Sequence, residues 1–198
     1  MKYRKTLRTI ISAALMLCMN SVTASAQTFV VKNNLLYDAT LTPNLGFEGA
    51  VAPRWTIGLN GGFNPWKHPY SDKEKQLRHV FISPEARYWF CSTFAGHFIG
   101  MNAAYSHFNI AKQGKPLSWL YKDIDTHRYQ GDMVAAGAFY GYSWILSNRW
   151  SLEAEIGADV GYAWWKKYPC AHCGVEIEKT SKPFVMPKAG INIVFNIK

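Results

Sequence analysis

The sequence predicts an all-β protein, specifically an eight-stranded antiparallel transmembrane β-barrel of the outer-membrane type. Three observations support this prediction: an export signal at the start of the chain, segments in which apolar and polar residues alternate, and short connections that alternate with long ones. Alternation with period two indicates strands with one apolar face. Short turns on one side and long loops on the other are typical of outer-membrane barrels.

Residues 1–26 are predicted to be a secretory signal peptide. Basic residues precede an apolar run at 10–19, and Ala24-Ser25-Ala26 provides the small side chains of a cleavage site. The apolar run is too short to cross a hydrocarbon core of ~30 Å as a helix. We therefore expect cleavage after Ala26, leaving a single barrel domain at 27–198 that is integral to the outer membrane.

The charge balance does not point to nucleic acid as a partner. The chain has 22 Lys and Arg against 13 Asp and Glu, a net charge of +9, and four of the basic residues lie in 1–26, which leaves +5 for 27–198. This modest excess is compatible with contact to outer-membrane lipid and lipopolysaccharide, or with plain solvation of loops. No part of 27–198 is continuously apolar for 18 residues, which excludes a helical membrane protein.

Eight segments carry the alternating pattern. We predict strands at 28–40, 43–52, 54–65, 79–90, 97–110, 130–146, 150–164 and 184–197. Many reach about ten residues, which suits tilted membrane strands better than the strands of about six residues found in soluble sandwiches. The connections at 66–78, 111–129 and 165–183 are then the three long surface loops.

Aromatic residues near the strand ends predict two interfacial girdles. The expected members are Trp55, Trp89, Phe90, Tyr142, Trp144 and Trp150 near the short turns, and Phe63, Trp66, Phe108, Trp164 and Trp165 near the long loops. The last strand carries Gly190, Ile193 and Phe195 at the spacing of an outer-membrane assembly signal, so the barrel-assembly machinery is an expected partner during biogenesis.

The polar faces of the strands are assigned to the barrel interior. The predicted lumen network consists of Lys32, Glu48, Glu85, Arg87, Glu153, Glu155, Asp159 and Lys188, and the same face carries Asn34, Asp38, Asn60, Asn102 and Asn192. Charges out of water are costly, so we expect them to pair across the interior and to fill it. The result is a plugged scaffold rather than a wide pore, with a purely structural polar core as the plainest interpretation.

A local motif, Cys170-Ala171-His172-Cys173-Gly174, lies in the last long loop. Two thiols at this spacing can close a small disulfide or, with His172 and a further ligand, hold zinc. An oxidising envelope favours the disulfide, and zinc and reduced thiols stay open as alternatives. We expect no other cofactor.

An enzymatic alternative is a lipid A-modifying enzyme with a Ser and His pair at the outer rim. Candidate residues are Ser106, His107, His79 and His127. Alternation points Ser106 and His107 to opposite faces, so we expect no enzyme.

From Gln27 onward the chain resembles an uncharacterised family of small outer-membrane β-barrel proteins from Bacteroidota, a domain of unknown function. The resemblance rests on five segments, at 140–144, 148–153, 157–162, 168–174 and 187–190, of which the cysteine pair followed by glycine is the most distinctive. It implies a membrane barrel without an established catalytic residue. Its association with fimbria-related gene neighbourhoods implies an accessory role in surface or fimbrial assembly, adhesion or envelope integrity, with surface or fimbrial proteins as partners.

Overall fold

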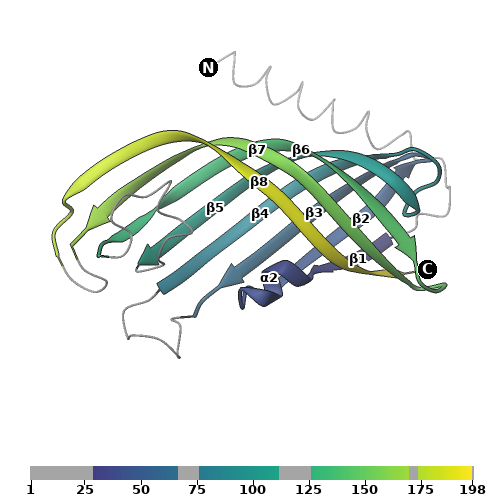
Figure 1. Ribbon diagram of the computed structural model, residues 1–198, viewed down its shortest axis with the longest axis horizontal. Coiled ribbons are helices and arrows are strands. Elements are labelled where there is room, and N and C mark those ends of the chain that lie inside the picture. The colour runs from purple at the N-terminus through teal and green to yellow at the C-terminus, as the bar shows by residue number, and fades with distance from the viewer. Residues whose placement is uncertain (1–28, 67–75, 112–125, 170–173, 198) are drawn as a thin grey trace, which may run out of the picture.

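A computed structural model describes residues 29–66, 76–111, 126–169 and 174–197. Eight antiparallel strands form a closed, hydrogen-bonded ring in which each strand pairs with its neighbours in the sequence and β8 returns to β1 (Figure 1). The strands are β1 (Phe29–Asn34), β2 (Asn44–Ala52), β3 (Trp55–Asn64), β4 (Gln76–Trp89), β5 (Gly96–Ala111), β6 (Arg128–Ile145), β7 (Trp150–Tyr168) and β8 (Glu178–Ile197). The predicted all-β class with eight antiparallel strands is confirmed.

The first strand is much shorter than predicted. β1 ends at Asn34, and a helix, α2 (Leu35–Ala39), replaces the rest of the strand expected at 28–40. The side chain of Asn34 caps this helix, because its Oδ1 accepts a hydrogen bond from the Leu36 amide at 2.9 Å. Alternation also stops here, since Leu35, Leu36 and Tyr37 are consecutive apolar or aromatic residues. The predicted strand at 28–40 was therefore wrong beyond Asn34.

The strands lengthen around the ring, from six residues in β1 to twenty in β8. In Figure 1 the C-terminus lies at the same end as the β2–β3 and β6–β7 turns, which we call the short-turn end. β6, β7 and β8 project furthest at the opposite end, which we call the long end. The long connections are shorter than predicted, because β4, β6, β7 and β8 all continue past their expected bounds.

The pairing register shows how strongly the strands are staggered. One path of directly paired residues runs through Val30, Glu48, Gly58, Glu85, Asn102, Gly137, Asp159 and Met186. Extending the β1–β8 register from Phe29 opposite Ile197, Met186 faces position 40, ten residues beyond Val30. Closed sheets with such a stagger have strands tilted by about 35–45° from the ring axis.

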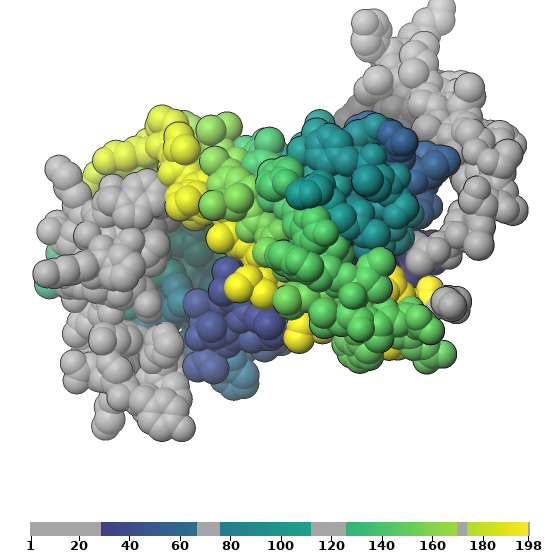
Figure 2. Space-filling model, turned by 45° about the vertical axis from the view of Figure 1, so that its right-hand side comes forward, coloured from purple at the N-terminus to yellow at the C-terminus, as the bar shows by residue number. Residues whose placement is uncertain are grey.

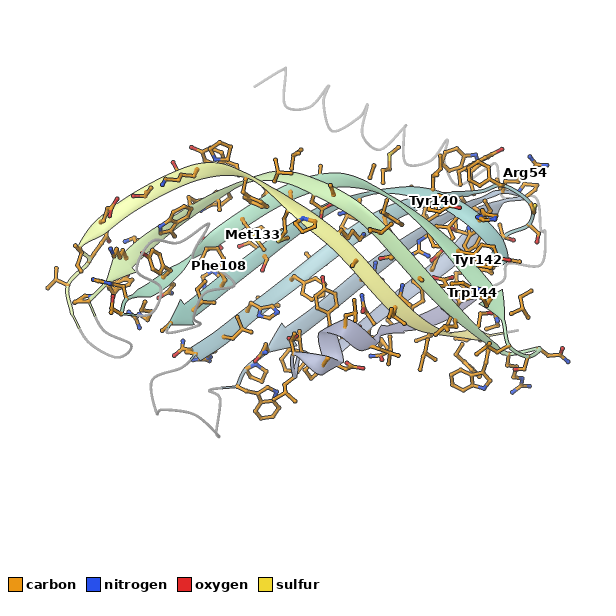
Figure 3. The ribbon with its side chains drawn as sticks, viewed as in Figure 1. Arg54, Phe108, Met133, Tyr140, Tyr142 and Trp144 are labelled. Atoms are coloured by element: carbon orange, nitrogen blue, oxygen red, sulfur yellow. The ribbon has the colours of Figure 1, made fainter. Side chains whose placement is uncertain are left out.

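The two faces of the sheet differ sharply in chemistry. The outward face exposes large apolar side chains, for example Ile57, Ile156 and Val185 at 56%, 67% and 63% exposure. Aromatic pairs gather on it near the short-turn end, where the ring centroids of Tyr142 and Trp144 lie 4.8 Å apart. Figure 3 shows these two residues with Tyr140 at the end where Arg54 marks the β2–β3 turn.

Three residues assigned to the aromatic girdles lie inside the ring instead. Trp89, Phe108 and Trp165 are 0%, 4% and 5% exposed. Trp89 follows the inward Arg87 by two residues, and Phe108 follows the inward Ser106 by two. Because side chains alternate along a strand, all three lie on the inward, polar face. The prediction was wrong for them because it relied on the clustering of aromatic residues near strand ends.

The interior is layered along the ring axis. A buried apolar cluster closes the short-turn end and consists of Val30, Trp89, Phe94, Phe98, Phe139 and Val194. A second cluster lies toward the long end and consists of Phe108, Ile110, Tyr129, Ala163, Trp165 and Phe184. Charged and polar residues lie between the two. No helix in the described part of the chain has the length and apolarity needed to cross a membrane.

The apolar layer at the short-turn end gives the first prediction. Trp89 is fully buried, packs against the tilted ring of Phe98 at 4.7 Å between centroids and donates from Nε1 to the Thr56 hydroxyl at 3.0 Å. Trp89→Ala should lower the free energy of unfolding by about 3–5 kcal/mol, measured by urea titration. Phe90→Ala, which truncates the exposed aromatic next to it, should cost clearly less. Equal losses in the two variants would place Trp89 outside the packed interior.

Candidate functional site

Six charged side chains from four strands meet between the two apolar layers. This charge cluster consists of Lys32, Glu48, Glu85, Arg87, Glu153 and Glu155. All six belong to the predicted lumen network, and each points inward because its strand alternates with period two. The cluster is almost completely shielded from solvent, with Lys32 at 3% and Arg87 at 1% exposure.

Arg87 of β4 is the centre of the cluster. Its Nη1 lies 2.8 Å from Glu153 Oε2, and its Nη2 lies 2.9 Å from Glu155 Oε2. Its Nε is 3.1 Å from Glu85 Oε1, and Nη1 is also 3.5 Å from Glu48 Oε2. One guanidinium thus contacts carboxylates on three strands, which suits its planar set of five donors.

Aromatic rings complete the surroundings of Arg87. The guanidinium carbon lies 4.6 Å from the Phe98 ring centroid and 5.3 Å from that of Phe139. Both rings belong to the apolar layer at the short-turn end. A cation over an aromatic face is stabilised by the ring quadrupole, more so away from water.

Lys32 of β1 neutralises the other side of the cluster. Its Nζ donates to Glu48 Oε2 at 2.5 Å and to Glu85 Oε1 at 2.6 Å. The second oxygen of Glu48 accepts from the hydroxyl of Thr56. Because Lys32 belongs to β1 and Glu85 to β4, this ion pair connects two strands that are not neighbours in the ring.

A second polar group lies next to the charge cluster on the side of the long end. Lys188 Nζ donates to Asn102 Oδ1 at 3.2 Å and is 3.8 Å from Glu155 Oε1. Asn102 Nδ2 in turn donates to Asp159 Oδ1 at 3.1 Å. Asn102 therefore bridges the two remaining members of the predicted network.

The interior is not electrically balanced. The predicted network contains five carboxylates against three basic groups. Three buried atoms of the charge cluster have no hydrogen-bond partner in the described part of the chain: the carboxylate oxygens Glu85 Oε2 and Glu153 Oε1, and the donor Arg87 Nε. The interior therefore favours an additional proton or cation over an additional anion.

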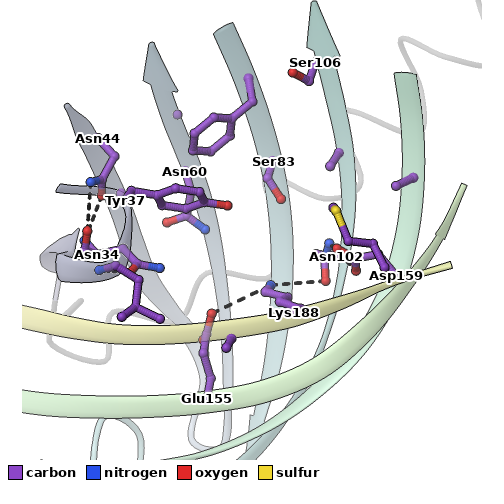
Figure 4. A pocket seen from close by; sticks show the side chains of 18 of the residues that line it. Asn34, Tyr37, Asn44, Asn60, Ser83, Asn102, Ser106, Glu155, Asp159 and Lys188 are labelled. Carbon is purple, nitrogen blue, oxygen red and sulfur yellow. Dashed lines mark hydrogen bonds and ion pairs between the residues drawn. The ribbon is translucent and has the colours of Figure 1, made fainter. Parts of the chain in front are cut away.

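A cavity of about 430 Å³ lies on the long-end side of the charge cluster (Figure 4). Asn60, Asn102 and Asp159 form part of its polar side. Leu77, Met133 and Met186 form part of its apolar side, where they pack against the buried cluster nearer the long end. The cavity is therefore amphipathic, with its charge concentrated at one end.

Two inward glycines leave room for the polar side of this cavity. A Cβ atom at Gly46 would lie 2.1 Å from Asn60 Oδ1, and one at Gly137 would lie 1.9 Å from Asp159 Oδ1. Any side chain at either position would displace these polar groups.

Tyr37 and Phe81 are lining residues that the sequence did not identify. Tyr37 reaches in from α2, and its ring centroid lies 4.9 Å from that of Phe81 on β4. Figure 4 shows Tyr37 on the same side of the cavity as Asn34 and Asn44. In the sequence, the one sign that residues 35–39 leave the sheet is the break in alternation at 35–37.

The remaining predicted residues lie elsewhere. Asp38 is exposed on α2 rather than inside the ring. Gly190, Ile193 and Phe195 lie on β8, with Gly190 opposite Glu155 in the register. Cys170, His172 and Cys173 fall outside the described residues, so the disulfide and zinc alternatives stay predictions. Cys91 is an exposed free thiol.

The candidate serine and histidines do not form a hydrogen-bonded pair in the described part of the chain. Ser106 and His79 both line the cavity, but the Ser106 hydroxyl donates to the Val80 carbonyl at 2.9 Å. His107 faces outward, where its Nδ1 lies 2.8 Å from Asp132 Oδ1. His127 instead contacts the neighbouring Thr126 hydroxyl at 2.7 Å. Among the described residues no group of three or more His, Cys, Asp or Glu side chains is arranged to hold a metal ion.

Among the residues of the charge cluster, Arg87 should contribute most to the free energy of unfolding. Arg87→Met leaves buried carboxylates without their main partner, so the free energy of unfolding should fall by about 3–5 kcal/mol in a urea titration. Arg78→Met, on the same strand but exposed, is the matched control and should change it by less than ~1 kcal/mol. A loss at Arg87 no larger than at Arg78 would contradict the central role of this guanidinium.

Comparison with known proteins identifies the family of this chain. A comparison with curated proteins finds no match. Residues 12–197 match the family described as "Protein of unknown function (DUF3575)". The expected relation to a family of unknown function is therefore confirmed. Because the match spans well over half of the sequence, the chain belongs to this family.

Proposed function

We propose that the chain is an integral outer-membrane β-barrel that acts without catalysis and presents its long connections at the cell surface. The observation that supports this most strongly is the inversion of the sheet, with charges buried inside the ring and large apolar side chains exposed outside. A soluble protein rarely exposes so extensive an apolar surface. A bilayer around the ring would cover it.

The pattern along single strands agrees with this environment. On β7, Glu153, Glu155 and Asp159 point inward, while Ile156 and Val160 point outward at 67% and 59% exposure. Apolar residues outside and polar residues inside are the arrangement of transmembrane barrels. The exposed aromatic pairs near the short-turn end, such as Trp150 and Phe195 at 4.9 Å between centroids, suit a membrane interface.

The filled interior supports a scaffold rather than a channel. The apolar layer around Trp89 and Phe98 closes the short-turn end, and the charge cluster fills the section above it. Arg87 and Lys32 are committed to carboxylates of the protein itself. The surface available to partners is then mainly the long end.

The long end is where we place the interactions with other molecules. The connections between β3 and β4, β5 and β6, and β7 and β8 all emerge there. Outer-membrane lipid and lipopolysaccharide are the proposed surroundings of the wall, and the barrel-assembly machinery is the proposed partner during insertion. Surface or fimbrial proteins are the proposed partners of the connections, in assembly, adhesion or envelope integrity. We propose no nucleic acid as a partner.

Fractionation tests the location. The protein should sediment with the outer membrane, resist extraction by carbonate, and migrate differently on gels before and after boiling, because a closed β-barrel resists unfolding by detergent. A deletion strain should keep the lipid A mass profile of its parent. Recovery in the periplasmic soluble fraction would exclude the membrane proposal, and an altered lipid A profile restored by complementation would favour an enzyme.

Epitope tags test the orientation. A tag inserted after Val175, between β7 and β8, should bind antibody on intact cells. A tag inserted after Asn148, in the β6–β7 turn, should bind only after the cells are permeabilised. The reverse pattern would mean that the long end faces the periplasm.

A further inference from the structure

The wall of the ring is open along one edge of β8. Residues 178–191 of β8 pair with β7, but only 192–197 pair with β1. On the β1 side, the longer stretch has no partner among the described strands, and α2 lies beside it (Figures 1 and 2). The cause is the stagger of ten residues, because β1 has only six and ends before the register path returns to it.

Two prolines hinder pairing along this open edge. The Asn196 amide donates to the Arg149 carbonyl on the β7 side at 2.8 Å, and the β7–β8 register is unbroken. Even-numbered residues of β8 therefore direct their N–H groups to β7, and odd-numbered ones direct theirs to the open edge. Pro183 and Pro187 have odd numbers and lack this donor. The addition of a further protein strand is thus disfavoured.

The interior cavity reaches this edge. Leu36 of α2 contributes to its lining, and so do Pro187 and Ala189, whose positions on β8 belong to the outward face. Met133 and Ala135 line the same cavity on β6. Residues of the outer wall and of the interior thus border one space of about 430 Å³, within the range of roughly 300–1,000 Å³ typical of small-molecule sites.

The charge at the polar side of the cavity selects the ligand class. Asp159 is 7% exposed, and its Oδ1 accepts from Asn102. No Lys or Arg nitrogen of the described residues forms an ion pair with it, since Lys188 pairs with Glu155 instead. The lining also includes three basic side chains, but each has carboxylate partners: Lys32 pairs with Glu48 and Glu85, Arg87 with Glu153 and Glu155, and Lys188 with Glu155. Asp159 is therefore the lining carboxylate without an ion pair among the described residues, and it would attract an ammonium group.

We propose that the cavity binds one single-chain amphiphile with an ammonium head group, which enters between α2 and β8. The head group lies at Asp159 and Asn102, and the apolar chain lies along Leu77, Met133 and Met186. This inference rests on the proposed membrane location, because a bilayer brings amphiphiles to the opening. It differs from the proposed surface role in that it assigns a binding site to the interior.

Two probes of equal chain length test the head-group preference. The folded protein in octyl tetraethylene glycol micelles is titrated with dodecylamine or dodecanoic acid and followed by native mass spectrometry. One dodecylamine should be retained per protein, with an affinity at least about tenfold higher than that of dodecanoic acid. Equal affinities, or no retention of either probe, would overturn the proposal. This measurement does not depend on where the protein fractionates, so it can fail while the proposed function stands.

Variants with matched controls localise the site. Asp159→Asn should abolish the preference for the amine, whereas Glu178→Gln, at the exposed far end of β8, should keep it. Ala104→Phe, which adds a ring inside the cavity, should abolish retention, whereas Ala103→Phe points outward and should not. The gel shift on boiling checks that each variant folds. Retention unchanged by both Asp159→Asn and Ala104→Phe would overturn the assignment.

The entry route has its own test. In phosphatidylcholine vesicles, Ala189→Trp should slow dodecylamine uptake, because Ala189 borders the opening. Ile191→Trp lies two residues away on the same outward face but outside the cavity lining, so it should not slow uptake. Identical uptake rates in the two variants would overturn entry between α2 and β8.

Discussion

The buried guanidinium of Arg87 is the interaction on which the rest of the interior depends. It contacts carboxylates from β2, β4 and β7 and lies against aromatic rings from β5 and β6, so one side chain links five strands of the ring. Buried ion pairs add little net stability when compared with apolar packing, but removing one partner is costly. Any register that separates these charges would leave some of them buried and unpaired, so the cluster penalises strand pairings other than the observed one.

That register has a consequence at the opposite end of the molecule. A stagger of ten residues requires strands of at least that length for every pairing path to close, and β1 has six. In place of the missing strand lies α2, which brings Tyr37 against Phe81. Residues 178–191 of β8 stay without a strand partner on the β1 side. The same feature thus produces both the amphipathic cavity and its opening toward the outward face. The ten-residue stagger, combined with the short β1, thus explains why the interior is closed at the short-turn end and open nearer the long end.

The sequence was sufficient for the class and the number of strands, because period-two alternation is a local property of each segment. It was not sufficient for Asp38, which was assigned to the inward face and lies exposed on α2. It was insufficient wherever the answer depends on register. Trp89, Phe108 and Trp165 were misassigned for a different reason: they were judged by their position near strand ends, although alternation within their own strands turns them inward. The helix after Asn34 was missed because the segment at 28–40 was treated as one strand, although alternation stops at Leu35. The hydrogen bond from the Leu36 amide to the Asn34 side chain, which caps the helix, could not be recognised from the sequence. The cavity arises from long-range pairing between β1 and β8, which no single segment encodes.

The proposed membrane location requires that the outward face of the ring contacts the bilayer while its inward face is shielded from it. Spin labels placed one at a time at 154–160 of β7, in a cysteine-free background reconstituted in bilayers, measure this directly. Collisions with oxygen, which concentrates in lipid, should peak at Ile156, Ala158 and Val160 and fall at the inward positions between them. A water-soluble nickel chelate should reach none of these outward positions. Free collision of the chelate with Ile156 and Val160, without alternation along the strand, would contradict the membrane-spanning arrangement.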